Sequence, residues 1–118
     1  MTEILKLVNS CPVFLDHNRG AWHYGISHEH DGVIGENLAR LGDIVFCSIN
    51  HRLGPMGFSD FSAVGGEKYA DSGNSGALDL VAALEWIRDN ISNFGGDPAN
   101  VTIMGQSGGG GKVVTTAA

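Results

Sequence analysis

Basic side chains are scarce in this chain, and their scarcity excludes one broad class of partner. Only 7 of the 118 residues are lysine or arginine, against 13 acidic residues, and the formal net charge is -6 at pH 7. Affinity for nucleic acids rests largely on clustered basic side chains that neutralise phosphates. We therefore expect no nucleic-acid partner.

Cysteines and long apolar runs are also few. The two cysteines, Cys11 and Cys47, do not make a disulfide framework in a chain of this length, and no charged-then-apolar leader opens the sequence. These two observations predict a reducing, cytoplasmic location. The longest apolar runs, such as residues 44–47, are far too short to cross a bilayer, so we expect no membrane span.

The apolar segments that are present follow the pattern of an α/β fold. Residues 13–15, 44–49 and 101–104 are short, largely apolar runs, as expected of strands that are covered on both faces in a parallel sheet. Residues 35–42 predict a short crossover helix between the first two runs, ended by a glycine.

A longer helix is expected between the second and third apolar runs. Leu80, Leu84, Ile87 and Ile91 recur at spacings of four, three and four, which forms one apolar stripe, and the glycines and proline of residues 94–98 end it. Right-handed crossovers would place the helices on both faces of the sheet. The sequence therefore predicts one domain over residues 1–118, with a three-layer α/β/α architecture around a mainly parallel sheet.

Residues 105–109 read G-Q-S-G-G and match G-x-S-x-G, the nucleophile elbow. A predicted strand precedes this pentapeptide and a helix-compatible segment follows it, as the motif requires. In such a turn Ser107 would be presented at the carboxyl edge of the sheet, and the Gly108 N–H could receive the negative charge of an acyl intermediate. An ordinary glycine turn with an exposed serine remains the alternative.

Two other interpretations of local patterns are weaker. Residues 110–112 resemble the end of a P-loop, but Gln106 and Val113 stand where that motif needs a glycine and a hydroxyl residue. Residues 28–31 read H-E-H-D and suggest a metal cluster, yet two histidines two residues apart in a loop favour a solvated polar turn. We expect no metal and no cofactor.

Several separated motifs resemble those of the type-B carboxylesterase and cholinesterase family. Residues 50–58 read N-H-R-L-G-P-M-G-F and residues 73–79 read G-N-S-G-A-L-D, as in the family's N-[YH]-R-L-G-P-x-G-F and G-N-x-G-x-x-D. The helix around A-A-L-E-W-I at 82–87, F-G-G-D-P at 94–98 and N-V-T at 100–102 follow in the family's order. The resemblance as a whole covers most of the chain, from about residue 12 to residue 112.

This resemblance implies a truncated α/β-hydrolase fold and a serine esterase that acts on small-molecule carboxylic esters through an acyl-serine intermediate. Ser107 matches the nucleophile. The other oxyanion amides would come from Arg19 and Gly20, because residues 17–22 read H-N-R-G-A-W where the family has H-G-G-G-[FW].

One departure from the family pattern concerns the remaining catalytic groups. The triad in this fold runs in the order serine, carboxylate, histidine, whereas all five histidines precede Ser107 and nothing after it is acidic. We therefore expect the chain alone to turn over very slowly. The alternative is an inert α/β binding module, whose open sheet edges would favour self-association or pairing with a complementary fragment.

Overall fold

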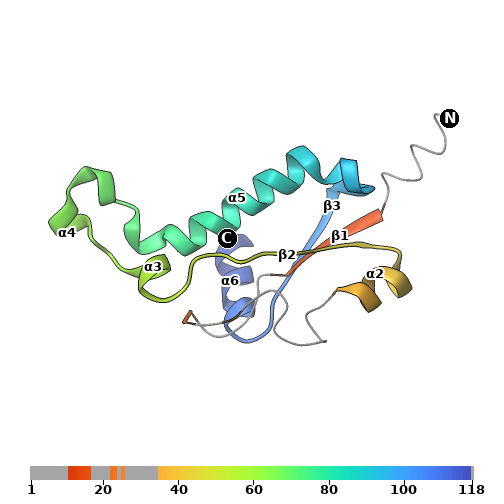
Figure 1. Cartoon of the computed structure of the whole chain (residues 1–118), viewed down its shortest axis with the longest axis horizontal. Coiled ribbons are helices and arrows are strands. Elements are labelled where there is room, and N and C mark those ends of the chain that lie inside the picture. The colour runs from red at the N-terminus through yellow and green to blue at the C-terminus, as the bar shows by residue number, and fades with distance from the viewer. Residues whose placement is uncertain (1–10, 17–21, 24, 26–34, 118) are drawn as a thin grey trace.

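A computed structural model of the chain describes residues 11–16, 22–23, 25 and 35–117 (Figure 1). The strands are β1 (Cys11–Asp16), β2 (Val45–Ser48) and β3 (Gly96–Met104). The helices are α2 (Glu36–Gly42), α3 (Gly54–Phe58), α4 (Ser62–Gly65), α5 (Ser75–Asn90) and α6 (Gly108–Ala117), and the 3-10 turns are Glu67–Tyr69, Ser72–Asn74 and Ile91–Phe94.

The three strands form one parallel sheet in the order β2-β1-β3. In register, Val13 of β1 lies between Val45 of β2 and Val101 of β3. Parallel neighbours need a crossover, and α2 supplies the one between β1 and β2. The predicted strand–helix–strand unit and parallel sheet are therefore both present.

The core lies between one face of this sheet and α5. Val13 and Leu15 are completely buried in β1, and Ile87 of α5 and Ile91 just beyond it are buried against them. Successive strand residues point to opposite faces, so the register neighbours of Val13 and Leu15 share this face. The side chains that pack around the buried cluster are Val45, Cys47, Ile49, Leu84, Val101 and Ile103.

The opposite face of the sheet carries α2. The backbone of Gly35, immediately before α2, lies directly against the ring of Phe46, leaving no room for a side chain at residue 35. Phe46 points away from the face that Val45 and Cys47 share, because it alternates with them along β2. Helices thus flank both faces (Figure 1), and the predicted three-layer α/β arrangement is confirmed.

The end of α5 follows its sequence signals. Gly95 has φ +84°, the left-handed conformation that glycine adopts without a Cβ penalty, and its N–H donates to the carbonyls of Ile91 and Ser92. Ile91 lies one position past α5 in a 3-10 turn, yet it still extends the buried stripe of that helix. The predicted helix stop is therefore correct.

Strand β3 begins earlier than the apolar run at 101–104 indicates. Cys11 pairs with Gly96 and Val13 pairs with Val101, so between these two pairs β3 advances by five residues while β1 advances by two. The extra residues include Pro98, which has no N–H for a sheet hydrogen bond. Asp97 accepts the Ala99 N–H at 2.8 Å within this irregular stretch. Regular pairing therefore resumes where the apolar residues start.

Within the described ranges, none of the helices combines the length and the apolar character that a bilayer crossing demands.

Candidate active site

The turn at Ser107 joins β3 to α6 and has an unusual backbone. The strand ends at Met104, the helix begins at Gly108, and Ser107 between them is exposed with φ +57°. A side-chain-bearing residue adopts the left-handed region at a cost of about 1–2 kcal/mol. Among the described residues Asp43, which caps α2, is the one other non-glycine with a positive φ. The strain at Ser107 marks a tight strand-to-helix elbow.

Glycines make this elbow sterically possible. The backbone of Gly105 lies so close to the backbone of Gly109 that a Cβ at residue 105 would overlap the residue 109 carbonyl. The turn is closed by the Gly109 N–H, which donates to the Gln106 carbonyl at 2.9 Å, and by the Gly111 N–H, which donates to the Ser107 carbonyl at 3.2 Å. Chain segments on the two sides of the serine therefore cross in direct contact.

Gly108 is the first residue of α6. The first N–H groups of a helix have no intrahelical carbonyl to bind, and the helix dipole adds partial positive charge at the same end. The Gly108 amide therefore follows the exposed residue Ser107, at a helix terminus that favours negative charge. This is the arrangement that an acyl-transfer oxyanion requires from one donor.

The carboxyl ends of the three strands are level. Met104 of β3 pairs with Asp16 of β1, and Asp16 pairs with Ser48 of β2. Ser107 follows β3 by three residues, so it lies at the carboxyl edge of the sheet, where open α/β sheets bind their ligands. Arg19 and Gly20, the expected oxyanion residues, follow β1 and lie outside the described residues, as do residues 28–31.

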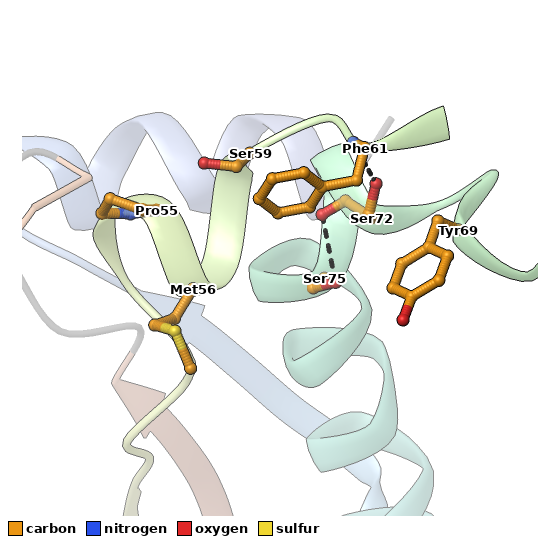
Figure 2. Close-up of a pocket in the computed structure, with 7 residues that line it drawn as sticks. All are labelled: Pro55, Met56, Ser59, Phe61, Tyr69, Ser72 and Ser75. Carbon is orange, nitrogen blue, oxygen red and sulfur yellow. Dashed lines mark hydrogen bonds between the residues drawn. The ribbon is translucent and has the colours of Figure 1, made fainter. Parts of the chain in front are cut away.

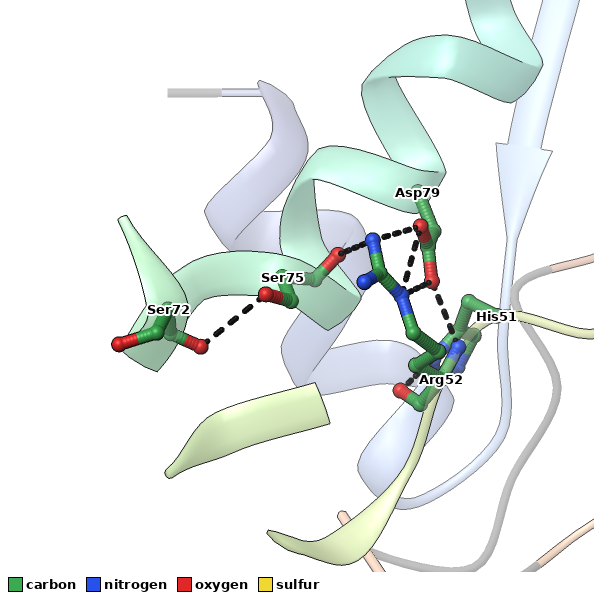
Figure 3. Close-up of polar contacts among 5 residues, drawn as sticks. All are labelled: His51, Arg52, Ser72, Ser75 and Asp79. Atoms are coloured by element: carbon green, nitrogen blue, oxygen red, sulfur yellow. Dashed lines mark hydrogen bonds and ion pairs between the residues drawn. The ribbon is translucent and has the colours of Figure 1, made fainter. Parts of the chain in front are cut away.

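An ion pair connects the segment after β2 to α5 (Figure 3). The Arg52 guanidinium contacts both carboxylate oxygens of Asp79, with Nη2 2.7 Å from Oδ1 and Nε 2.9 Å from Oδ2. The Arg52 backbone N–H donates to Oδ2 at 2.7 Å. These hydrogen bonds hold the pKa of Asp79 below its ordinary value. The two residues lie in the separate motifs at 50–58 and 73–79, and neither motif indicates that they pair.

His51 is buried beside this ion pair, with 7% of its surface exposed. Its Nδ1 lies 2.9 Å from the Arg52 carbonyl oxygen, and a carbonyl can only accept, so Nδ1 carries a proton and donates. The ring is therefore oriented by the backbone of the next residue (Figure 3). Its geometry fits a structural histidine in the segment that follows β2.

Two apolar hollows lie among the helices. One has a volume of about 270 Å³ (Figure 2), and Ser72 Oγ in its wall accepts the Phe61 N–H at 2.7 Å. Its lining residues include no histidine or carboxylate; they are Pro55, Met56, Ser59, Phe61, Tyr69, Ser72 and Ser75. The second hollow, also about 270 Å³, is lined by Trp22, Phe58, Asn74, Ala77 and Thr115. Apart from Trp22, these residues come from α3, the 3-10 turn Ser72–Asn74, α5 and α6.

Lys112 does not have the environment of a phosphate-binding lysine. Residues 108–111 form the first turn of α6, and the Lys112 side chain is completely buried with Nζ 5.4 Å from the centre of the Trp22 ring. These glycines are therefore helical and do not form the open loop that binds phosphate in a P-loop. Lys112 follows the buried Gly109 by three residues, so the two residues lie on the same face of α6.

No group of three or more histidine, cysteine, aspartate or glutamate side chains suited to a metal ion occurs in the part of the chain that the structure describes. The candidate site is therefore built from Ser107 and the amide of Gly108. The roles assigned to these two residues from the sequence stay predictions, although the strand and the helix expected on either side of Ser107 are both present.

Comparison with known proteins identifies relatives over most of the chain. Residues 6–118 match the model of the carboxylesterase family. The para-nitrobenzyl esterase of Bacillus subtilis is 46% identical over 101 residues, which cover 84% of this chain and 19% of that protein. A human cocaine esterase is 44% identical over 105 residues, which cover 89% of this chain and 17% of that protein.

Solved structures give the same result for the fold. An esterase from Clostridium hathewayi, described as able to hydrolyse aliphatic aromatic polyesters, superposes with a TM-score of 0.84 at 53% identity, covering 87% of this chain and 20% of that one. A carboxylesterase from Geobacillus stearothermophilus superposes with a TM-score of 0.84 at 42% identity, covering 89% and 22%. The chain spans about a fifth of the length of these relatives.

Proposed function

Because this chain belongs to the carboxylesterase family, we propose that it carries the nucleophile of a carboxylic-ester hydrolase, Ser107. The observation that supports this role is the left-handed backbone of Ser107, at φ +57°, between β3 and α6. A serine is held in a strained conformation only where its surroundings impose it, and such strain is typical of functional turns.

The proposed reaction has two steps. Ser107 Oγ attacks the acyl carbon of the ester and loses its proton, and collapse of the tetrahedral intermediate breaks the bond to the alcohol, which leaves with a proton. Water then attacks the acyl-serine and releases the carboxylic acid. The Gly108 N–H would hold the oxyanion in both steps, together with the amides of Gly20 and Arg19.

The general base and the residue that orients it would come from polypeptide other than residues 108–117. In this fold the carboxylate and the histidine follow the serine, and the chain holds neither after Ser107. We propose that Ser107 depends on a histidine from a complementary part of the hydrolase fold. The 118-residue chain by itself should then hydrolyse p-nitrophenyl acetate far more slowly than a complete triad does.

The substrates that we propose are carboxylic esters in which the acyl carbon can reach an exposed serine. Ser107 is exposed and lies at the edge of the sheet, so the turn itself sets no narrow limit on the acyl group. Polyester fragments are worth testing as well, because a structural relative at 53% identity is described as hydrolysing aliphatic aromatic polyesters.

A fluorophosphonate probe tests the nucleophile directly, because it forms a covalent bond with an activated serine. Because the general base is expected from other polypeptide, the unsubstituted chain should be labelled slowly, over a long incubation at high probe concentration. Ser107→Ala should lose this label, and Ser92→Ala, a second exposed serine, should keep it. Labelling that persists in Ser107→Ala, or no labelling of the unsubstituted chain, would contradict the proposal. In the second case the chain would be the inert α/β module instead.

We also propose that the chain associates with a complementary polypeptide or with itself. Several large apolar side chains are mostly exposed, among them Leu41 at 90%, Val64 at 85% and Met56 at 78%. Strands β2 and β3 are the outer strands of the described sheet, and outer strands offer unpaired backbone groups to a partner. Sedimentation equilibrium over a range of concentrations tests this, and a strictly monomeric chain would contradict self-association.

For location we propose a reducing compartment, the cytoplasm, and the cysteines support it. Cys47 pairs in register with Leu15, four residues along β1 from Cys11, which is about 13 Å of extended strand. A disulfide needs Cα atoms within about 7 Å. Both cysteines are free thiols. Detection of the folded protein outside the cytoplasm would contradict this location.

A further inference from the structure

The helix that follows the nucleophile is built from residues that favour helices poorly. α6 reads G-G-G-G-K-V-V-T-T-A, so eight of its ten residues are glycine, valine or threonine. At a helix position glycine is about four- to fivefold less favourable than alanine, and β-branched residues are about two- to threefold less favourable. By contrast, half of the 16 residues of α5 are alanine, leucine, glutamate or arginine, which form helices readily. The ester hydrolysis described above gives no reason for this difference.

Packing stabilises α6 less than it stabilises α5. The stripe of α5 buries Leu80 and Ile87. The buried residues of α6 are Gly109, which has no side chain, and Lys112, while Val114 is 72% exposed. Helices as short as α6 are marginal in water and depend on buried apolar side chains for their stability. Since α6 buries few of them, it should open at a lower free energy than α5.

The threonines in the last turn of α6 weaken it further. Thr115 Oγ1 donates to the Gly111 carbonyl at 3.0 Å. Thr116 Oγ1 donates to the Lys112 carbonyl at 2.7 Å. Such bonds to the carbonyl four residues earlier compete with the backbone N–H groups of the helix and slightly destabilise it. Both ends of α6 therefore contain destabilising features.

The shape of the turn does not require glycine at residue 111. A Cβ there would meet Trp22 Cζ2 at an ordinary 3.8 Å, and the residue is helical rather than left-handed. At Gly105, by contrast, a Cβ would overlap the backbone of Gly109. Glycine at residue 111 therefore lowers the stability of α6 without being needed for a close approach.

The stability of α6 bears directly on the nucleophile. The Gly111 N–H donates to the Ser107 carbonyl at 3.2 Å, so the first turn of the helix is bonded to the serine itself. Unwinding of this turn breaks that bond. It also takes the Gly108 N–H away from a helix terminus where the dipole favours negative charge. Chains in which α6 is open therefore lack the fixed turn that presents Ser107 and its proposed oxyanion donor.

We propose that α6 is a conditional helix: it opens and re-forms within the folded chain, and Ser107 reacts as a nucleophile only while the helix is formed. This inference rests on the proposed function. The measured reactivity of Ser107 is then reduced by the fraction of chains in which α6 is open. An anionic oxygen held at the Gly108 N–H shifts the equilibrium toward the formed helix, because it gives the helix terminus an acceptor.

A matched pair of valines tests the proposal. Val114→Ala on α6 and Val81→Ala on α5 make the same change at an exposed residue of each helix. We expect Val114→Ala to raise the second-order rate constant of fluorophosphonate labelling about two- to threefold, and Gly111→Ala to raise it up to about fivefold. Val81→Ala should leave the rate unchanged, because the formation of α5 does not limit it. Equal rates for both α6 variants and the unsubstituted chain would overturn the inference.

Amide hydrogen exchange reports the helix without any chemistry at Ser107. In the unlabelled chain the amides of residues 112–117 should exchange faster than those of residues 80–90, and Gly111→Ala should slow them. Labelling of Ser107 should also slow them, because the phosphonate oxygen can accept the Gly108 N–H. If the amides of α6 are as protected as those of α5 in the unlabelled chain, α6 is permanently formed and the inference is overturned.

The two measurements separate the possible failures. Labelling at equal rates in all variants overturns the inference and leaves Ser107 as the proposed nucleophile. Absence of labelling in every variant overturns the proposed function and with it the link between α6 and reactivity. In that case the exchange of residues 112–117 still decides whether the helix itself opens.

Discussion

Gly105 and Gly109 lie backbone against backbone on either side of Ser107. The last strand and the last helix of the described chain cross at this contact, and Ser107, the residue between them, is exposed. Glycine at residue 105 therefore allows β3 and α6 to approach this closely.

Gly105→Ala should destabilise the chain by about 1–3 kcal/mol, because the added methyl group would overlap backbone atoms that cannot rotate away. Gly111→Ala is the matched control, since its Cβ would meet only Trp22 Cζ2 at an ordinary 3.8 Å. Within a helix that change should be neutral or stabilise by up to about 1 kcal/mol. Urea denaturation of the two variants measures the difference, and equal stabilities would contradict the crossing.

Ser107→Gly and Ser107→Ala should differ in stability although both remove the hydroxyl. Alanine retains the cost of a Cβ at φ +57°, whereas glycine removes this cost. Part of that stabilisation is offset because glycine loses more conformational entropy on folding. We expect the glycine variant to be more stable than the alanine variant by roughly 0.5–1 kcal/mol. Thermal denaturation followed by circular dichroism tests this order, and a more stable alanine variant would mean that residue 107 is unstrained.

Asp79→Asn should lower the melting temperature at neutral pH. Its pKa in the folded chain is held below the ordinary value of 3.8, mainly by the hydrogen bonds from Arg52. The stabilisation is therefore fully present above that pH and is lost as the pH falls through the lower folded-state pKa. Melting curves of Asp79→Asn and the unsubstituted chain should converge at low pH.

Asp89→Asn provides the control for that experiment. Asp89 also pairs with an arginine, Arg88 at 2.7 Å, but both side chains are more than half exposed and they are neighbours in sequence. Solvent screening makes such pairs weak. Its substitution should change the melting temperature little at any pH. If Asp89→Asn lowered the melting temperature as much as Asp79→Asn, the position of the Arg52–Asp79 pair in the fold would be unimportant.

Cys47 should react slowly with a maleimide in the folded chain at pH 7. Burial raises the pKa of its thiol, which lowers the fraction of reactive thiolate, and its side chain packs against the core cluster. Cysteine-to-serine variants leave one thiol at a time, so that the rate of each is measured separately. Unfolding in urea should speed the reaction of Cys47, and a rate that is the same in both states would contradict its packing.

The elements around Ser107 could be predicted from the sequence because their signals are local. The apolar run at 101–104, the five residues of the elbow and the apolar spacing of α5 each depend on neighbouring residues. By contrast, α3 and α4 have five and four residues, too few to show a period. The order β2-β1-β3 likewise depends on contacts between distant segments.

Long-range contacts account for what the sequence did not reveal at the site. Arg52 and Asp79 are 27 residues apart, and no local pattern indicates that they pair. Lys112 looked like the end of a phosphate loop because glycines precede it, whereas the fold places Trp22 over its amino group. Burial of a charged residue is decided by the segment that covers it, and that segment lies 90 residues earlier.

The register that pairs Asp16 with Met104 determines both the burial of the core and the position of the candidate site. A slip of one residue between β1 and β3 would turn Val13 and Leu15 out of the hydrophobic interior. The same slip would also misalign the two strand ends from which the nucleophile and the proposed anion-binding segment depart. Substitutions that preserve the burial of Val13 and Leu15 therefore also preserve the register on which the position of Ser107 at the sheet edge depends.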